Sequence, residues 1–454
     1  MHKFRPAQII IFGFLALIML GALFLSLPAA TTSDTQLGFA DALFTATSAV
    51  CVTGLVVADT GTTFTLFGQI VILLLIQIGG LGVMTVMTLV FVLLGKRITL
   101  SERMVIKEAL GEQNLSGVVR MILKVVKYTL VFELAGAAVL AVRFVPMLGA
   151  RGIFYSVFHA VSAFCNAGFD LMGAVSGKYT SLSVFASDPL VLLTVSALFI
   201  FGGLGFVVIA DVFNFDHFRG RRKLSRYSKL VLITNALLIA AGMAAVFSFE
   251  LFNPRTLGEM DTGGKLLSGF FQAVTPRTAG FSTIGQGSLL PATRLIVMIL
   301  MFIGASPAGT GGGIKTTTLA VVAIFAFSSV KRCEDVNILG RRLAYDTLRR
   351  ALSILVFALL FVLIACFTMI AVEESRQEAM FTSSNIVFEV ISAFGTVGLS
   401  TGLTPYLSVL SKFILVATMF TGRIGLMTLV FGLSSRTLKE CSTLRYPEER
   451  FMVG

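Results

Sequence analysis

The run Ser48-Ala49-Val50-Cys51-Val52-Thr53-Gly54 ends a short apolar stretch with small residues and a glycine. Three later segments repeat this pattern: Ser162-Ala163-Phe164-Cys165-Asn166-Ala167-Gly168, Thr275-Pro276-Arg277-Thr278-Ala279-Gly280 and Ser392-Ala393-Phe394-Gly395-Thr396-Val397-Gly398. The four final glycines lie roughly 115 residues apart, and similarity at a nearly fixed period is typical of a repeated structural unit. The sequence therefore predicts four copies of one unit.

The composition places this chain in a lipid bilayer. Of its 454 residues, 56% are hydrophobic and only 13% are charged, whereas charged residues make up about a quarter of a soluble domain. Apolar stretches at 9–27, 66–94, 189–213 and 353–372 reach the roughly 20 residues that cross a hydrocarbon core. Lipid offers no hydrogen-bond partner to a bare peptide group, so these segments should be helical. We interpret the first as a transmembrane helix and not a secretory signal, because its apolar length is a full span.

Each unit contains an apolar segment that is too short to cross the membrane. In the first unit, a full-length helix at 8–27 precedes a short helix at 39–50, the glycine turn at 51–55 and a second full-length helix at 66–94. About a dozen helical residues rise only about 18 Å, little more than half of a 30 Å core, so the short helix must re-enter on the side where it began. The corresponding short helices are expected at 152–164, 264–274 and 382–394, and the first spanning helices at 125–147, 229–249 and 350–372.

These segments predict an all-α membrane protein with eight transmembrane helices and four re-entrant half helices. The unit comprising spanning helix, re-entrant helix and second spanning helix (M1-P-M2) would occur four times, with pseudo-fourfold symmetry around one pore. The predicted boundaries are 1–95, 96–215 with a cytoplasmic linker, 216–330 with a broken second helix, and 331–454 with a cytoplasmic tail.

The glycine turns are expected to face the pore. Irregular backbone at membrane depth persists only where protein or a water-filled cavity surrounds it. Glycine permits torsions that other residues avoid, so four such turns could direct carbonyl oxygens inward to replace the water around a cation. The half helices would also direct their partly negative C-terminal ends at the membrane centre. This arrangement is that of an ion selectivity filter.

Glycines also recur in the second helices, at Gly79-Gly80-Leu81-Gly82, Gly202-Gly203-Leu204-Gly205 and Gly422-Arg423-Ile424-Gly425. Close helix packing explains such glycines in general, but their fixed distance from each turn also favours a place along the inner pore.

The third unit differs, because a run rich in glycine with one proline, 304–313, must break its second helix at mid-membrane. This run lacks the ending of a phosphate-binding loop, since Ile314 precedes Lys315, and no strand comes before it.

Two arginines lie in unusual positions for a membrane segment. Arg423 lies inside the last spanning helix, where a charge costs roughly 2.5 to 3.5 kcal/mol. It either ties the helix to a neighbouring carboxylate or carbonyl, or hinders ion leakage while binding the carbonyls of the broken third-unit loop; the two readings are compatible. Arg277 lies within a turn, so its side chain should point away from the pore axis, with Glu389 as a guessed partner.

The formal charge of +12 is distributed along the chain in a pattern typical of membrane topology. Basic residues fill three alternate connections: Lys96, Arg97, Arg103, Lys107, Arg120, Lys124 and Lys127; Arg219, Arg221, Arg222, Lys223, Arg226 and Lys229; Lys331, Arg332, Arg341, Arg342, Arg349 and Arg350. The connections near 31–41, 249–261 and 372–382 are poor in basic residues. This asymmetry predicts that both termini are cytoplasmic. The charges share no soluble face for nucleic acid, although membrane lipid or an acidic partner could bind them.

Cysteine and histidine give no sign of a disulfide framework or a metal cluster. The five cysteines are an odd number, and Cys333 and Cys441 fall on the predicted cytosolic side, where thiols stay reduced. Cys51 and Cys165 occupy equivalent places, three residues before a glycine. His2, His159 and His217 are scattered. No organic cofactor is expected.

The four units, the turns, the run Thr278-Ala279-Gly280-Phe281, the loop at 304–313 and Arg423 together resemble the superfamily of Trk, Ktr and HKT potassium transporters. Because the first unit begins near residue 8 with no further helix pair before it, the chain is most similar to the bacterial KtrB family of membrane subunits. The resemblance implies K+ transport, with or without assistance from Na+, across the bacterial inner (plasma) membrane. It also implies a homodimer on a cytosolic ring of KtrA-type nucleotide-binding subunits, and a gate in the third-unit loop.

The resemblance assigns residues to two sites. The backbone carbonyls of the K+ selectivity filter would come from Cys51, Val52, Thr53, Gly54, Cys165, Asn166, Ala167, Gly168, Arg277, Thr278, Ala279, Gly280, Gly395, Thr396, Val397 and Gly398. The gate would comprise Gly304, Ala305, Ser306, Pro307, Ala308, Gly309, Thr310, Gly311, Gly312, Gly313, Lys315 and Arg423. Sodium-preferring relatives carry serine in place of the first-unit glycine, so Gly54 favours potassium.

Two other transport functions are compatible with parts of this pattern, and an enzymatic role is a third alternative. Turns with single glycines should form fewer ordered ion sites than the Thr-Val-Gly-Tyr-Gly filter of tetrameric channels, which leaves open a less selective K+/Na+ channel. An alternating-access solute symporter also uses broken helices, but it predicts inverted halves and not four like-oriented units. An enzyme would need a nucleotide motif, a metal cluster or a nucleophile-base pair, and none is evident.

Overall fold

The computed structural model describes residues 6–32, 37–93, 118–213, 223–331, 335–374, 376 and 380–433. In these ranges the chain is mainly helical, with one small hairpin formed by β1 (Asn337–Ile338) and β2 (Arg341–Arg342). Four helices are long and apolar enough to cross a bilayer. They are α1 (Pro6–Leu25), α7 (Val118–Leu148), α13 (Arg226–Glu250) and α17 (Tyr345–Glu373).

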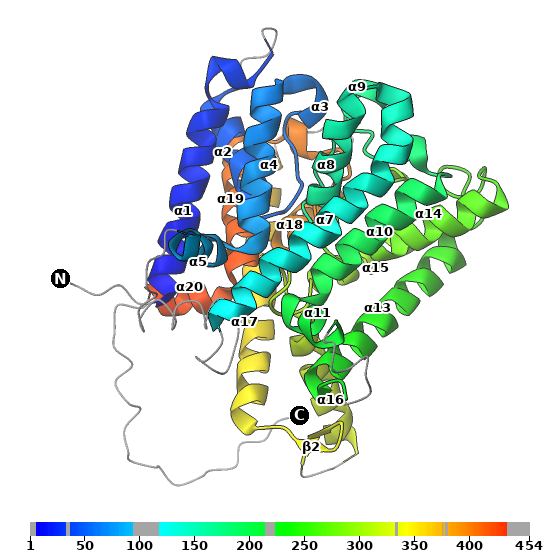
Figure 1. Cartoon of the computed structure of the whole chain (residues 1–454). Coiled ribbons are helices and arrows are strands. Elements are labelled where there is room, and N and C mark those ends of the chain that lie inside the picture. The colour runs from blue at the N-terminus through cyan, green and yellow to red at the C-terminus, as the bar shows by residue number, and fades with distance from the viewer. Residues whose placement is uncertain are drawn as a thin grey trace.

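A short helix follows each long one and packs against it. These helices are α2 (Phe39–Val50), α8 (Arg151–Phe164), α14 (Thr262–Val274) and α18 (Ser383–Gly395), and they contain between 12 and 14 residues. Their bounds agree with the predicted half helices to within about two residues, which is the usual uncertainty of helix ends. In Figure 1 they occupy the upper half of the molecule, whereas α16 and the β hairpin lie at its lower end.

The later helices of the units are interrupted, which corrects one prediction. The sequence predicted single helices over 66–94 and 189–213, but helices end and restart at Gly82 and Gly205, and again at Gly425 in the last unit. The segments are α4 (Leu66–Leu81) and α5 (Val83–Leu93), α10 (Pro189–Leu204) and α11 (Phe206–Val212), and α19 (Val409–Ile424) and α20 (Leu426–Leu433). The φ angles of the three glycines lie between 84° and 91°, which a right-handed helix cannot accommodate. The axes of α10 and α11 differ by 103°.

The second helix of the third unit is broken at the glycine-rich run, as predicted, and this break is the longest in the described residues. Helix α15 (Pro291–Phe302) and helix α16 (Thr316–Val330) are separated by residues 303–315, which include the glycine-rich run. Residues Ile303 and Ile314 at the two ends of this loop pair in parallel, and the Gly304 amide donates to the Ile314 carbonyl over 2.9 Å. All four second helices are therefore broken, and the third differs in the length of its break.

The units close into a ring through contacts between each second helix and the next short helix. Helix α4 packs on α8, α10 on α14, α15 on α18, and α19 returns to α2. Six shorter elements lie in the connections between these helices: α3 (Thr60–Thr63), α9 (Gly173–Ser176) and the 3-10 turns η1 (Pro28–Ala30), η2 (Ser183–Phe185), η3 (Gln286–Ser288) and η4 (Thr404–Tyr406). The ring places the ends of the short helices at the centre of the molecule.

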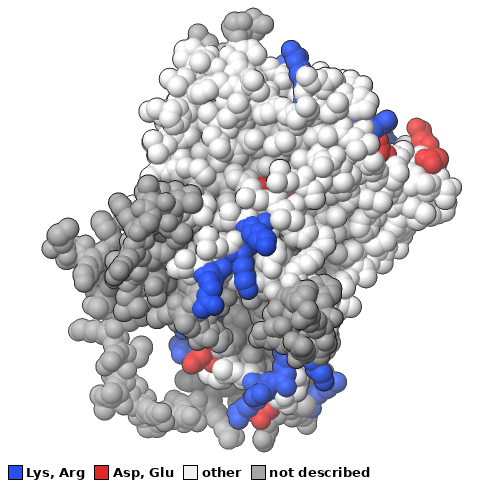
Figure 2. Space-filling view, in the orientation of Figure 1, with Lys and Arg blue, Asp and Glu red and all other residues white. Residues whose placement is uncertain are grey.

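Surface properties match an integral membrane protein. Large apolar side chains are exposed on the long helices, for example Leu134 on α7, Leu237 on α13 and Phe367 on α17. Figure 2 shows most of the visible basic residues on the lower part of this face and few charges above them. The described basic residues that are exposed near the lower helix ends include Arg120, Lys124, Lys127, Lys223, Arg226, Lys229, Arg341, Arg342, Arg349 and Arg350.

Part of the predicted charge pattern falls outside the described residues. This applies to Lys96, Arg97, Arg103, Lys107, Arg219, Arg221, Arg222 and Arg332. The two predicted cytosolic cysteines, Cys333 and Cys441, two histidines, His2 and His217, and the predicted tail from residue 434 onward also lie outside the described residues.

Candidate functional site

The four glycine turns meet at the centre of the molecule and form a closed ring. The carbonyl oxygen of the residue before each glycine lies against the glycine of a neighbouring turn. The contacts run from Ala167 to Gly54, from Ala279 to Gly168, from Val397 to Gly280 and from Thr53 to Gly398. A Cβ on Gly168 would lie 2.8 Å from the Cα of Gly280 and 3.0 Å from the carbonyl oxygen of Ala279, so no side chain fits there.

The backbone adopts the same unusual conformation in all four turns. The φ angles of the glycines lie between 68° and 91°. Two residues earlier, Val52, Asn166, Thr278 and Thr396 have φ angles of 57°, 59°, 68° and 50°. The left-handed region is a genuine outlier for β-branched residues, and such strain persists only where the surroundings impose it. Fourfold repetition of one strained conformation marks this ring as the candidate site.

Serine residues on the short helices hold three of the four turns in place. The Ser392 carbonyl accepts from the Val397 amide at 2.9 Å, and its hydroxyl accepts from the Gly398 amide at 3.1 Å. Ser48 makes the same two bonds to the first turn, at 2.8 and 3.1 Å. Ser162 accepts from the Ala167 amide at 2.7 Å. Sequence reasoning missed this role, although the recurrence of serine six residues before the glycine in three segments was a usable signal.

All the residues assigned to the filter from the sequence are buried around this ring. The second and third turns are also joined directly, because Asn166 Nδ2 donates to Thr278 Oγ1 at 3.0 Å. The guessed pairing of Arg277 with Glu389 is wrong. Glu389 accepts hydrogen bonds from Ser400 and from the residues around it, which hold the loop after the fourth turn. Arg277 Nε has no hydrogen-bond partner in the described part of the chain.

A cavity of about 300 Å³ lies above the ring. All four glycines line it: Gly54, Gly168, Gly280 and Gly398. The residues two positions after each glycine line it as well, and these are Val56, Asp170, Ser282 and Ser400. The ring is therefore open to a polar chamber on the side where the short helices begin.

The glycine-rich loop of the third unit lies on the other side of the ring. The Gly312 amide donates to Thr396 Oγ1 at 2.8 Å, and Thr310 Oγ1 donates to Asn166 Oδ1 at 3.1 Å. The loop also binds the broken helices, since the Thr310 amide donates to Gly202 and the Gly313 amide to Gly422, each at 3.2 Å. The loop therefore covers the ring from below and is held by the second and fourth turns.

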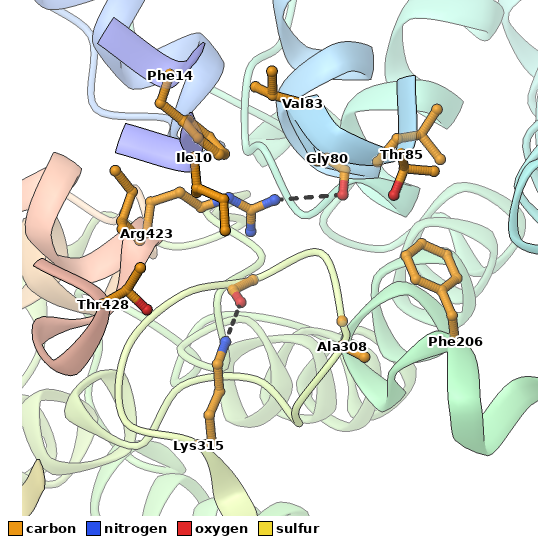
Figure 3. Close-up of a pocket in the computed structure, with 15 residues that line it drawn as sticks. Ile10, Phe14, Gly80, Val83, Thr85, Phe206, Ala308, Lys315, Arg423 and Thr428 are labelled. Atoms are coloured by element: carbon orange, nitrogen blue, oxygen red, sulfur yellow. Dashed lines mark hydrogen bonds between the residues drawn. The ribbon is translucent and has the colours of Figure 1, made fainter. Parts of the chain in front are cut away.

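Arg423 and Lys315 place two cationic side chains against this loop. Arg423 donates to the carbonyls of Thr310, Gly79 and Gly80, so the predicted contact with the third-unit loop is present. Lys315 Nζ donates to the Gly311 carbonyl at 2.8 Å. Figure 3 shows both side chains beside a cavity of about 200 Å³. The effect of these charges on ion passage stays a prediction.

An apolar helical chain whose backbone carbonyls form a ring between two cavities has the architecture of an ion-transporting membrane protein. The sequence matches the family model TrkH, described as cation transport protein, over residues 6–436. The chain belongs to this TrkH family of cation transport proteins.

Curated relatives match over nearly the whole chain. Ktr system potassium uptake protein B from Bacillus subtilis is 42% identical over 453 residues, which cover 100% of this chain and 97% of the relative. The potassium/sodium uptake protein NtpJ from Enterococcus hirae is 39% identical, with coverage of 100% and 98%. The crystal structure of the potassium transporter TrkH from Vibrio parahaemolyticus matches with a TM-score of 0.71 at 16% identity, covering 94% of this chain and 85% of that one, and it supports the fold.

Proposed function

We propose that this chain is the ion-translocating subunit of a potassium uptake system and that K+ crosses the membrane through the ring of glycine turns. The observation that carries this proposal is the closed fourfold contact between carbonyl oxygens and glycines. Membership of a cation transport family and the potassium uptake named for its relatives support the choice of ion. No enzymatic step is part of the proposal.

K+ enters the upper cavity hydrated and exchanges its water for the backbone oxygens of the filter residues. The short helices α2, α8, α14 and α18 end at the ring, and the partial negative charge of helix C-termini favours a cation there. An interior-negative membrane potential supplies about 2.3 kcal/mol per charge and per 100 mV, so uptake needs no ATP in this chain.

The loop 304–313, with Lys315 and Arg423, acts as the gate. Its contacts with Asn166 and Thr396 cover the lower side of the ring, and its glycines allow it to change conformation without steric cost. Movement of this loop away from the ring opens the path to the lower side.

The proposed topology has eight membrane spans in four M1-P-M2 repeats, with the boundaries 1–95, 96–215, 216–330 and 331–454. Two parts of each broken helix together would form one span, as α4 with α5 and α10 with α11. The basic residues near the lower ends of α7, α13 and α17 favour a cytoplasmic lower side and cytoplasmic termini. The membrane is the bacterial plasma membrane.

The proposed assembly is a homodimer with one pore per protomer, seated on a KtrA-type cytosolic ring. Support comes from two relatives, from Bacillus subtilis and Vibrio alginolyticus, that are named as proteins of a Ktr system. Membrane lipid surrounds the exposed apolar helices.

A second candidate is a less selective path for K+ and Na+. The name of the Enterococcus relative, a potassium/sodium uptake protein, favours it. Gly54 at the first turn favours potassium, because the resemblance implies serine there in sodium-preferring transporters. Sodium would then assist uptake or compete with K+ in the same ring.

Flux measurements decide between these functions. The chain is reconstituted in proteoliposomes with and without its regulatory ring, and entry of K+ and of Na+ is followed under an imposed inside-negative potential. We expect K+ entry that exceeds Na+ entry. Equal entry of both ions supports the less selective channel, and absence of any cation flux with the ring present overturns the proposal. Restored growth of a potassium-uptake-deficient host at low K+ is the matching cellular result.

A further inference from the structure

Two carboxyl groups, those of Asp59 and Asp170, line the cavity above the ring. Among the four residues placed two positions after the ring glycines, Val56 is apolar, Ser282 and Ser400 carry hydroxyls, and Asp170 carries a carboxyl group. The fourfold backbone therefore presents three kinds of side chain at one level, and Asp170 is the one acidic residue among the four. Every ion that reaches the ring from this side passes that level.

The contacts of Asp170 leave one of its oxygens available. The Met172 amide donates to Oδ1 at 2.9 Å, and this is the one side-chain hydrogen bond of Asp170 within the described ranges. Asp59, the other carboxyl group that lines the cavity, is fully engaged. Its Oδ2 accepts from the Thr62 amide and hydroxyl at 2.9 and 2.8 Å, and its Oδ1 accepts from the Tyr179 amide at 3.1 Å. Asp59 holds the loops together, and Asp170 remains for a ligand.

The surroundings of Asp170 disfavour its charge when no cation is present. Burial, and then the nearby carboxylate of Asp59, raise the pKa of Asp170 to about 7, whereas the Met172 amide lowers it. The other titratable groups around it are Tyr155 and His159 on α8, and Tyr179 beside Asp59. The first cause is desolvation, which a dehydrating cation would offset.

We propose that the carboxylate of Asp170 binds the transported cation at the outer mouth of the ring and that protons compete with K+ for this group. This inference rests on the proposed function, and it adds a binding residue and a pH dependence to it. The carboxylate attracts a hydrated cation into the cavity and lies directly before the point where backbone oxygens take over. Protonation removes this attraction without altering the ring.

The sign of the pH dependence follows from the direction of the pKa shift. Below about pH 7 the group is mainly neutral, and above it the group is mainly ionised. A site that binds K+ only in its ionised form is about 90% available one unit above the pKa and about 10% available one unit below it. The KM for K+ should therefore rise by up to about tenfold from pH 8 to pH 6, whereas the maximal flux at saturating K+ should change little.

The test compares Asp170→Asn with the unaltered chain in proteoliposomes at external pH values from 6 to 8. Asparagine keeps the shape and can still accept the Met172 hydrogen bond through its side-chain oxygen. We expect Asp170→Asn to show a raised KM for K+ that no longer varies with pH, at a maximal flux within about twofold of the unaltered value. Asp170→Glu, which retains the charge, should keep a pH-dependent KM.

A second readout does not depend on flux. Bound K+ stabilises the folded protein in proportion to its occupancy, so K+ should raise the melting temperature of the detergent-solubilised chain more at pH 8 than at pH 6. This difference should vanish in Asp170→Asn. Asp261→Asn is the matched control, because Asp261 caps α14 on the same side but lines a different cavity.

The outcomes separate this inference from the proposed function. K+ flux in Asp170→Asn with the KM and pH profile of the unaltered chain overturns the role of Asp170 and leaves potassium transport standing. A pH-dependent KM that persists in Asp170→Asn overturns the proton competition at this residue. Absence of K+ flux in the unaltered chain with its ring counts against the proposed function itself.

Discussion

The carbonyl oxygen of Thr53 occupies the space that a Cβ on Gly398 would need. This contact joins the first turn of the chain to the last, and it closes the ring that the other three contacts begin. The ring therefore depends on contacts between units that are far apart in sequence.

Gly398→Ala should therefore disrupt ion passage. Gly398 has a φ of 89°, where an L-residue is strained by roughly 1 to 2 kcal/mol, and the added methyl group would collide with Thr53. We expect K+ flux in proteoliposomes to fall at least about tenfold, the change that about 1.4 kcal/mol in a barrier produces. Gly38→Ala is the control, because Gly38 has a φ of −62° and nothing within 4 Å of an added Cβ. Normal flux in Gly398→Ala would show that the ring tolerates a side chain.

Gly54→Ser tests the choice of ion at the first turn. The added Cβ would meet the carbonyl oxygen of Ala167, which lies against Gly54 in the ring. Displacement of this oxygen should weaken the site for K+, and the resemblance implies that serine here favours sodium. We expect the ratio of K+ to Na+ flux to fall several-fold. An unchanged ratio, measured beside Gly38→Ser, would contradict the assignment of Gly54 to the filter.

The location of the ring could be predicted from the sequence because small residues and glycine recur at one period. The conformation of the turns could not be predicted so directly. Val52, Thr278 and Thr396 are β-branched, and local preference disfavours the left-handed angles that they adopt. Contacts between turns from different units impose these angles, and such contacts are not visible in any single segment.

The breaks at Gly82, Gly205 and Gly425 were missed for a related reason. Glycine in an apolar helix usually permits close packing, and the two interpretations of these runs, close packing or a place along the inner pore, both kept the helices continuous. The earlier glycines do pack closely, since the Cβ of a residue at Gly202 would collide with the Phe164 carbonyl, whereas the last glycine of each run ends the helix. The pairing of Arg277 with Glu389 was predicted wrongly, because burial of an arginine without an ion pair has no signature in sequence.

Ser392→Ala should destabilise the fourth turn. The substitution removes the hydroxyl that accepts from the Gly398 amide and leaves that buried donor without its partner, at a cost of about 1 to 3 kcal/mol. We expect a lower melting temperature of the purified protein together with reduced K+ flux. Ser248→Ala is the matched control, since Ser248 is exposed on α13 and donates only to its own helix. Equal melting temperatures for the two variants would contradict the anchoring role of Ser392.

Arg423→Gln separates the two readings of the buried arginine. The guanidinium joins the Thr310 carbonyl in the loop to the carbonyls of Gly79 and Gly80 beside the break in the first unit. If Arg423 holds the gate closed, the variant should pass more K+ than the unaltered chain in proteoliposomes without the regulatory ring. Loss of folded protein would instead favour a purely structural tie. Arg226→Gln, at an exposed site at the start of α13, controls for the loss of one positive charge.

Glu133 supplies a test of support from behind the ring. This buried carboxyl group on α7 accepts from Gln77 Nε2 at 3.3 Å and from Cys165 Sγ at 3.8 Å, and Cys165 belongs to the second turn. An acidic side chain inside a membrane segment is costly, and it usually persists because it acts on a nearby site. Glu133→Gln keeps the volume but replaces one carboxyl oxygen with an amide group, so the side chain can no longer accept from both Gln77 and Cys165, and the second turn loses part of its anchor. We expect a shift of about twofold or more in the ratio of K+ to Na+ flux with little change in melting temperature.

A double-mutant cycle distinguishes this positioning role from a direct effect of charge on the ion. If Glu133 acts through Cys165, the Glu133→Gln substitution should have little further effect in a Cys165→Ala background, because the contact is already absent. If the carboxylate acts on the ion through its field, the effects of the two substitutions on the flux ratio should add. Glu133→Gln with an unchanged flux ratio in both backgrounds would exclude both roles and leave Glu133 as a packing residue of α7.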